Sequence, residues 1–175
     1  MTRRDLPATS DICRELAAAL RQRGWMMASA ESCTGGLIAG ACTDLSGSSD
    51  WFERGFVTYS NQAKIDLLGV DAALLQHEGA VSEAVARAMA RGAVDRAPVQ
   101  VAVAVTGVAG PAGGSVEKPV GTVWFGWNVD GRLSSEQQRF AGNRAAIRSA
   151  TVDHALARLL AGIRGAPATP ADDGR

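Results

Sequence analysis

The chain has 175 residues, which is long enough for one domain with a sizeable core. Its 18 basic and 18 acidic residues cancel, so no strong positive field favours a nucleic-acid partner. No apolar run approaches the length that spans a membrane, and the N-terminal residues lack the apolar core of a secretion signal. These features predict a cytoplasmic protein with neither a nucleic-acid nor a membrane partner.

The cysteines and histidines do not form a metal-binding pattern. Cys13, Cys33 and Cys42 are odd in number and include no C-x-x-C pair, which argues against a disulfide framework or a structural zinc site. His77 and His154 are far apart in sequence, and no cluster of carboxylates accompanies either of them. We therefore expect no metal site.

The first half of the chain alternates helical and strand patterns. Apolar residues at helical spacing predict a helix over 10–23, which Ser10 or Asp11 caps and Gly24 ends. The next patterns predict, in order, a short buried strand over 25–30, a helix over 35–45, a second strand over 54–60, a helix from an Asn61 cap to Gly69, a short helix from Asp71, and a longer helix from Ser82 to 96.

The second half begins with an apolar strand over 99–105, followed by a glycine-rich loop over 106–119. The pair Asp130-Gly131 favours a two-residue turn, so the segments 120–129 and 132–140 are predicted to form an antiparallel hairpin. Asn143 is expected to cap a last helix.

This order of elements predicts a three-layer α/β/α sandwich with a mixed, mostly parallel sheet and a late antiparallel hairpin. We expect an N-terminal arm over 1–9, a single domain over 10–163, and a disordered tail over 164–175, which is rich in Ala, Pro, Gly and Asp. Folds of this kind place their chemistry where strands end and helices begin.

The first junction of this kind is the segment A-E-S-C-T-G-G over 30–36. Either Ser32 or Thr34 caps the following helix, or the helix N-terminus stabilises an oxyanion beside Ser32 acting as a nucleophile. Cys33 is a competing nucleophile, because a helix N-terminus lowers the pKa of a thiol, but neither histidine lies near a strand end to serve as its base. Glu31 is expected to be structural.

The second junction is T-Y-S-N-Q-A-K over 58–64. If Asn61 is the cap, Lys64 occupies the third helical position, where the helix dipole repels a cation. Either Lys64 extends into water, or this repulsion and desolvation lower its pKa toward neutrality, so that it acts as a general base for a serine. Tyr59 is either a core ring with a solvated hydroxyl or a proton relay between the lysine and the serine.

The third junction is the glycine-rich stretch 106–121, whose backbone N–H groups are of the kind that bind phosphate. It lacks the G-K-[ST] ending of a Walker loop, and an ordinary connection remains the alternative. Trp124 and Trp127 on the next strand are more commonly core residues than ring-stacking ones. The candidate binding residues here are Thr106, Gly107, Gly110, Gly113, Gly114, Ser115 and Lys118, with Arg144 as a further candidate for phosphate.

Taken together, these segments resemble the CinA C-terminal domain family, and in particular its stand-alone nicotinamide-nucleotide amidohydrolases. The resemblance extends from about residue 10 to 162. Many relatives carry an additional N-terminal molybdopterin-binding-like domain, for which 175 residues leave no room. The motifs that carry the resemblance are A-E-S-C-T-G-G over 30–36, W-F-E-R-G-F-V-T-Y-S-N-Q-A-K over 51–64, G-A-V-S-E over 79–83, and the stretch 106–124.

The resemblance implies hydrolysis of the carboxamide of nicotinamide mononucleotide to nicotinate mononucleotide and ammonia, in pyridine-nucleotide recycling. It further implies a homodimer that needs no metal or cofactor. Ser32 would be the nucleophile, Lys64 its base, and Tyr59 a neighbour of the pair. Thr106 stands where relatives can have serine and keeps the hydroxyl. Residues implied to bind substrate or its oxyanion are Cys33, Thr34, Gly35 and Gly36.

Three alternatives remain open from the sequence. One is an amidase for another small amide, with the same two residues and a different pocket. Another is a non-catalytic nucleotide- or partner-binding module linked to competence and DNA damage, as the family name implies. The third is an enzyme that uses Cys33 as its nucleophile.

Overall fold

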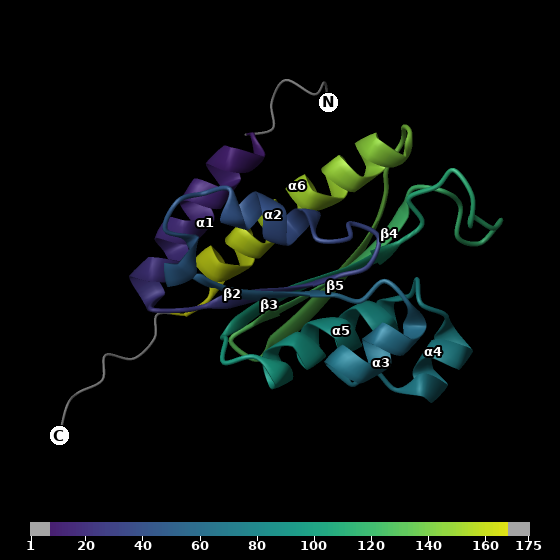
Figure 1. Cartoon of the computed structure of the whole chain (residues 1–175), viewed down its shortest axis with the longest axis horizontal. Helices are drawn as coiled ribbons and strands as arrows, with labels where there is room; N and C mark the ends of the chain where they lie inside the picture. Colours follow the sequence, from purple (N-terminus) through teal and green to yellow (C-terminus); the bar gives the residue numbers. More distant parts are fainter. Residues whose placement is uncertain (1–7, 168–175) are drawn as a thin grey trace.

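The computed structural model describes residues 8–167, which form a five-stranded sheet between two layers of helices (Figure 1). The strands are β1 (Met27–Glu31), β2 (Phe52–Val57), β3 (Val101–Gly107), β4 (Thr122–Val129) and β5 (Arg132–Arg139). The helices are α1 (Thr9–Arg23), α2 (Leu37–Thr43), α3 (Asn61–Leu68), α4 (Ala72–Glu78), α5 (Glu83–Arg96) and α6 (Arg144–Gly165), with a 3-10 helix η1 at Ser48–Asp50.

The strand order in the sheet is β2-β1-β3-β4-β5. β1 pairs in parallel with β2 and β3, whereas β4 is antiparallel to both β3 and β5. The β4–β5 turn uses Asp130 (φ 51°) and Gly131 (φ 78°), and two successive positive φ angles are what a two-residue hairpin turn requires. The predicted mixed, mostly parallel sheet with a late hairpin is therefore confirmed.

Helices α1, α2 and α6 cover one face of the sheet, and α3, α4 and α5 cover the other (Figure 1). The alternation of β3 explains the two cores. Val101, Val103 and Val105 pack into the core with α1, α2 and α6, while Ala102 and Ala104 pack into the core with α5. Ser32 follows β1 directly, so it lies at the end of the sheet where the parallel strands β1, β2 and β3 have their C-terminal residues.

The predicted cap of α1 is wrong. The helix begins at Thr9, and Ala8 occupies the N-cap position without a side-chain hydrogen bond, in place of Ser10 or Asp11. The Thr9 hydroxyl donates to Asp153 on α6, so the first turn of the helix is held by a tertiary contact.

The predicted tail overlaps the last helix. Helix α6 extends to Gly165, so the predicted tail from 164 begins with helical residues. Residues 1–7 of the predicted arm and residues 168–175 of the predicted tail lie outside the described range.

Candidate active site

Ser32 lies in a tight turn between β1 and α2. Its N–H donates to Val105 O (3.0 Å), which continues the pairing of β1 with β3, and its own carbonyl accepts from Gly35 N–H (3.1 Å). Gly35 and Gly36 have φ angles of 59° and 99°, a region that glycine enters at little cost. The turn leaves the Ser32 side chain partly exposed at the surface, where a substrate can reach it.

Lys64 extends from α3 toward the same turn. The N-cap of α3 is Ser60, whose hydroxyl accepts from Ala63 N–H (3.0 Å), so the predicted Asn61 cap is wrong and Lys64 is the fourth helical residue. Its side chain is 1% exposed. The Lys64 Nζ lies 3.0 Å from Ser32 Oγ and donates to Thr58 O at 2.8 Å. The structure therefore brings the two predicted reactive groups within hydrogen-bond reach.

Burial lowers the pKa of the Lys64 ammonium below its ordinary value, because the charged form loses its hydration inside the protein. The neighbouring Cys33 thiol acts in the opposite direction, and burial prevails. The sequence predicts that the helix dipole contributes to this lowering, and burial of the side chain is the largest cause in the folded protein. A neutral amine has a lone pair that can accept the Ser32 proton.

Cys33 is a poor candidate for the nucleophile. Its side chain is 6% exposed, and burial raises the pKa of its thiol to about 11, outweighing the stabilisation that its own N–H gives the thiolate. At neutral pH the thiol is therefore protonated, and the protonated form is not nucleophilic.

Tyr59 lies at the rim of the site and not between the reactive pair. Its side chain is 63% exposed, and its hydroxyl accepts a hydrogen bond from Arg144 Nη2 (3.0 Å). Arg144 also donates to Gly110 O (3.0 Å), so this arginine joins three segments that are distant in sequence. Since Lys64 and Ser32 already lie in direct contact, the geometry does not require Tyr59 as a relay.

Comparison with known proteins identifies the family. Residues 9–163 match the CinA C-terminal domain. The chain belongs to the CinA C-terminal domain family. It is 58% identical over 135 residues to the nicotinamide-nucleotide amidohydrolase PncC of Enterobacter agglomerans, a match that covers 77% of this chain and 82% of that protein.

Two further relatives agree with this assignment to the CinA C-terminal domain family. The nicotinamide-nucleotide amidohydrolase PncC of Escherichia coli strain K12 is 48% identical over 149 residues, covering 85% of this chain and 90% of that protein. Among solved structures, the competence damage-inducible protein A of Klebsiella pneumoniae matches with a TM-score of 0.89 and 38% identity, covering 92% of this chain and 100% of that one.

The glycine-rich loop of this CinA C-terminal domain contacts neighbouring segments near both of its ends. Thr106 lies at the end of β3, and its hydroxyl donates to Ala80 O (2.8 Å), which ties β3 to the segment before α5. Gly107 is the last residue of β3, and Gly110 reaches the site through Arg144. The rest of the loop, with Gly113, Gly114 and Ser115, extends beyond the sheet between β3 and β4 (Figure 1).

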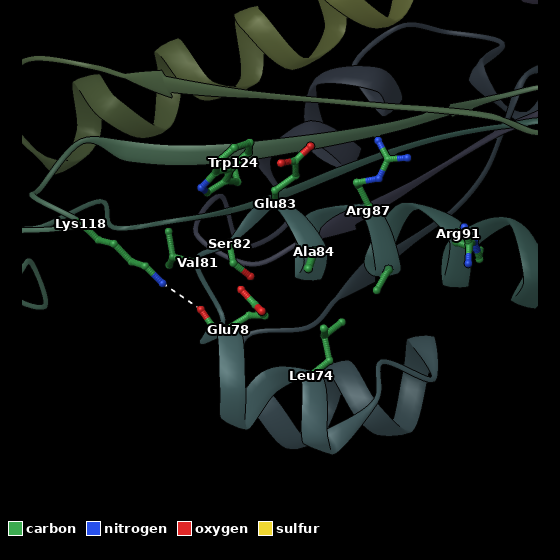
Figure 2. A pocket seen from close by; sticks show the side chains of 11 residues that line it. Leu74, Glu78, Val81, Ser82, Glu83, Ala84, Arg87, Arg91, Lys118 and Trp124 are labelled. Atoms are coloured by element: carbon green, nitrogen blue, oxygen red, sulfur yellow. Dashed lines mark hydrogen bonds between the residues drawn. The ribbon is translucent and has the colours of Figure 1, made fainter.

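Lys118, the other predicted phosphate ligand, lines a groove of about 700 Å³ between α4, α5 and β4 (Figure 2). Its Nζ donates to Glu78 O (2.9 Å) at the C-terminal end of α4. Neither Ser32 nor Lys64 lines this groove. Its charges are mixed, since Arg87 and Arg91 line it together with Glu78 and Glu83, so it does not form a site for one sign of charge (Figure 2).

The two tryptophans of β4 have different surroundings. Trp124 lines the same groove and is partly exposed (Figure 2). Trp127 is buried, stacks on Phe125 with ring centroids 5.5 Å apart, and donates from Nε1 to Ala155 O (3.0 Å). Trp127 is therefore a core residue.

Sequence reasoning missed two features of the site. Thr58 contributes a backbone carbonyl, which carries no side-chain signal. Arg148 donates to the carbonyls of Cys33 and Thr34, and its spacing of four residues from Arg144 was the available signal, because residues at i and i+4 share a helix face.

Within residues 8–167, no group of three or more His, Cys, Asp or Glu side chains is arranged to hold a metal ion. The same part of the chain contains no helix with the length and apolarity needed to cross a membrane.

Proposed function

We propose that this chain hydrolyses the carboxamide of nicotinamide mononucleotide, giving nicotinate mononucleotide and ammonia. The observation that carries the proposal is the 3.0 Å separation between Ser32 Oγ and the buried Lys64 Nζ. A serine paired with a desolvated amine suits acyl transfer from an amide. The relatives named nicotinamide-nucleotide amidohydrolase supply the substrate class.

In the first step, neutral Lys64 accepts the Ser32 proton while Ser32 Oγ attacks the carboxamide carbon. Lys64 donates one N–H to Thr58 O, which orients the amine so that its lone pair can face the serine. Deprotonation by a positioned base contributes about 10²- to 10⁴-fold to such a step. Direct transfer needs no intermediate group at this distance.

The carboxamide oxygen becomes an oxyanion and needs hydrogen-bond donors. In the segment 32–36, the N–H groups of Ser32, Gly35 and Gly36 already donate to Val105 O, Ser32 O and Glu31 Oε2. The remaining donors are the N–H groups of Cys33 and Thr34, and loss of one such donor typically raises the barrier by about 3 kcal/mol. The resemblance predicts that Gly35 and Gly36 bind the substrate or its oxyanion, but their N–H groups are already occupied, so their role in this proposal is to shape the turn.

The intermediate then collapses to a Ser32 ester. Protonated Lys64 returns its proton to the amide nitrogen, the C–N bond breaks, and ammonia leaves. Neutral Lys64 next takes a proton from water, whose oxygen attacks the ester carbon, and Ser32 regains its proton as the acid is released. The cationic pyridinium ring of the substrate withdraws electrons from the carboxamide and favours the neutral form of Lys64.

The test is incubation of the chain with nicotinamide mononucleotide in the presence of EDTA, with ammonia and the acid product both quantified. We expect equal amounts of the two, and no effect of the chelator. Free nicotinamide and other small amides serve as competing substrates, and faster turnover of one of them would indicate a different amidase. Binding of the nucleotide without ammonia release would instead indicate a binding module.

Tyr59→Phe should retain activity within about tenfold of wild type, because Lys64 contacts Ser32 directly and needs no relay. Loss of a true proton relay would lower kcat by about 10²-fold or more. The phenyl ring keeps the apolar contacts and removes only the hydroxyl that Arg144 contacts. Steady-state measurement of kcat and KM checks this result. A kcat reduced beyond 10²-fold with an unchanged KM would make Tyr59 a relay after all.

Cys33→Ala should keep kcat within about threefold of wild type, because the buried thiol is protonated at neutral pH. The intact protein should also tolerate a thiol-blocking reagent for the same reason. Activity that disappears in Cys33→Ala while the melting temperature is unchanged would promote the thiol to nucleophile.

The wider expectations of the resemblance stay proposals. They are a homodimer, a cytoplasmic location and a role in pyridine-nucleotide recycling. Sedimentation of the full chain tests the first of these, with a dimer as the expected species.

A further inference from the structure

The turn that carries Ser32 is fixed from one side by Glu31. The Glu31 side chain is fully buried, and its carboxylate accepts hydrogen bonds in place of the predicted caps Ser32 and Thr34. A carboxylate beneath a helix N-terminus is favoured by the dipole of that helix. The donors are Ser29 Oγ (3.1 Å), Thr34 Oγ1 (2.7 Å), Gly36 N (3.0 Å), Ile38 N (3.0 Å) and Ala39 N (2.8 Å).

The same turn is fixed from the other side by Arg148 of α6. Arg148 Nε donates to Cys33 O (3.1 Å), and Arg148 Nη2 donates to Thr34 O (2.7 Å). One planar guanidinium thus holds two successive carbonyls, which the single ammonium of a lysine cannot do with the same geometry. The position of α6 against the sheet is thereby coupled to the orientation of the turn.

This contact determines where one N–H group points. The Cys33 carbonyl and the Thr34 N–H belong to one trans peptide unit, and in such a unit the two bonds point in opposite directions. Arg148 holds the carbonyl, so the Thr34 N–H is directed away from α6. No acceptor among residues 8–167 takes that N–H. The charge on Arg148 also polarises the peptide and strengthens the N–H as a donor.

We propose that Arg148 is a positioning residue for catalysis, which acts through the Cys33–Thr34 peptide to aim the Thr34 N–H at the developing oxyanion. Glu31 fixes the opposite side of the same turn. The inference rests on the proposed acyl transfer by Ser32, and it assigns Arg148 no contact with the substrate. Among residues 8–167, Arg148 makes its hydrogen bonds to the carbonyls of Cys33 and Thr34 and Lys64 makes its own to Ser32 and Thr58, so Arg148 should affect the stabilisation of the oxyanion and not the base.

The test compares Arg148→Ala and Arg148→Lys with Arg164→Ala on the same helix. Arg164 pairs with Glu15 at the surface (2.6 Å), and such exposed pairs contribute little. Two substrates are used: nicotinamide mononucleotide, and p-nitrophenyl acetate, an activated ester that needs the nucleophile and the oxyanion donor but not the nucleotide pocket. Melting temperature is recorded for every variant.

With both substrates, we expect kcat to fall about 10²-fold in Arg148→Ala, with KM and the pH of the rising kcat/KM limb unchanged. The kcat of Arg148→Lys should lie between those of Arg148→Ala and wild type, and the kcat of Arg164→Ala should stay within about twofold of wild type. An Arg148→Ala kcat within threefold of wild type overturns the proposal, as does a shifted pH limb. If Arg148→Ala does not fold, Arg148→Lys decides, with a reduced kcat at a normal melting temperature as the expected result.

A second variant removes the donor itself. Incorporation of the α-hydroxy acid analogue of threonine at position 34 converts the Cys33–Thr34 amide into an ester, which deletes that N–H and also weakens the Cys33 carbonyl as an acceptor for Arg148. The same loss of kcat is expected, and adding Arg148→Ala should cause little further loss, because two changes to one interaction are not additive. Full additivity would mean that Arg148 acts by another route. If the wild-type protein hydrolyses p-nitrophenyl acetate but releases no ammonia from nicotinamide mononucleotide, only the proposed substrate is refuted.

Discussion

Ser32→Ala is expected to reduce ammonia release from nicotinamide mononucleotide by at least about 10³-fold, because removal of a serine nucleophile leaves only the contribution of binding and oxyanion donors. The fold should be unaffected. Ser32 is partly exposed, its backbone hydrogen bonds to Val105 and Gly35 do not involve the side chain, and Lys64 keeps its contact with Thr58.

The measurement is kcat from ammonia release, together with the melting temperature. Ser149→Ala is a matched control. Ser149 is exposed on α6, and its substitution makes the same chemical change away from the reactive pair. The control should keep wild-type kcat. Wild-type turnover by Ser32→Ala would remove this serine from the mechanism and leave Lys64 to activate water or another group.

Lys64→Met is expected to lower kcat by about 10²- to 10⁴-fold, which is the contribution of a general base. Methionine has a similar length and fits a side-chain position that is 1% exposed. Lys64→Arg should be at least as inactive, because a guanidinium stays protonated at any ordinary pH and has no lone pair for the serine proton. Activity retained in Lys64→Arg would assign Lys64 a binding role.

The same residue predicts two pH effects with a definite sign. Burial lowers the pKa of Lys64 in the folded protein, so kcat/KM should rise with pH as the amine becomes neutral. Between the lowered pKa and the ordinary value, the unfolded state binds more protons than the folded one, and the free energy of unfolding of wild type therefore rises with pH. Lys64→Met lacks this group, so wild type should gain stability relative to Lys64→Met as pH rises. Urea unfolding at a series of pH values measures the difference.

The residue spacing indicated a possible nucleophile and a possible base, and only the family resemblance predicted that Ser32 and Lys64 meet; the structure gives the physical reason. Each follows a strand, β1 or β2, and these strands pair in parallel, so their C-terminal ends lie together. Folding two strand–helix junctions side by side brings the first residues of both into one place. The alternation of valine and alanine in β3 likewise predicts a strand buried on both faces.

Contacts between distant side chains could not be predicted in this way. Glu31 replaces Ser32 and Thr34 as the cap because its carboxylate lies beneath a helix that begins six residues later. Tyr59 and Arg144 are 85 residues apart, and only the folded chain places the hydroxyl on that guanidinium. The choice of Ser60 over Asn61 as the α3 cap is a shift of one residue, which local propensity does not resolve because both are favourable caps.

The ionisation of Lys64 can be measured directly, because the chain contains only two lysines, Lys64 and Lys118. In Lys118→Arg protein labelled with ¹³Cε-lysine, the one remaining lysine signal reports Lys64 alone. We predict that it titrates below the ordinary lysine value of about 10.4, at the same pH as the rising limb of kcat/KM in the same protein. A titration at or above that value, or one that does not coincide with the kinetic limb, would contradict the assignment of Lys64 as the neutral base of Ser32.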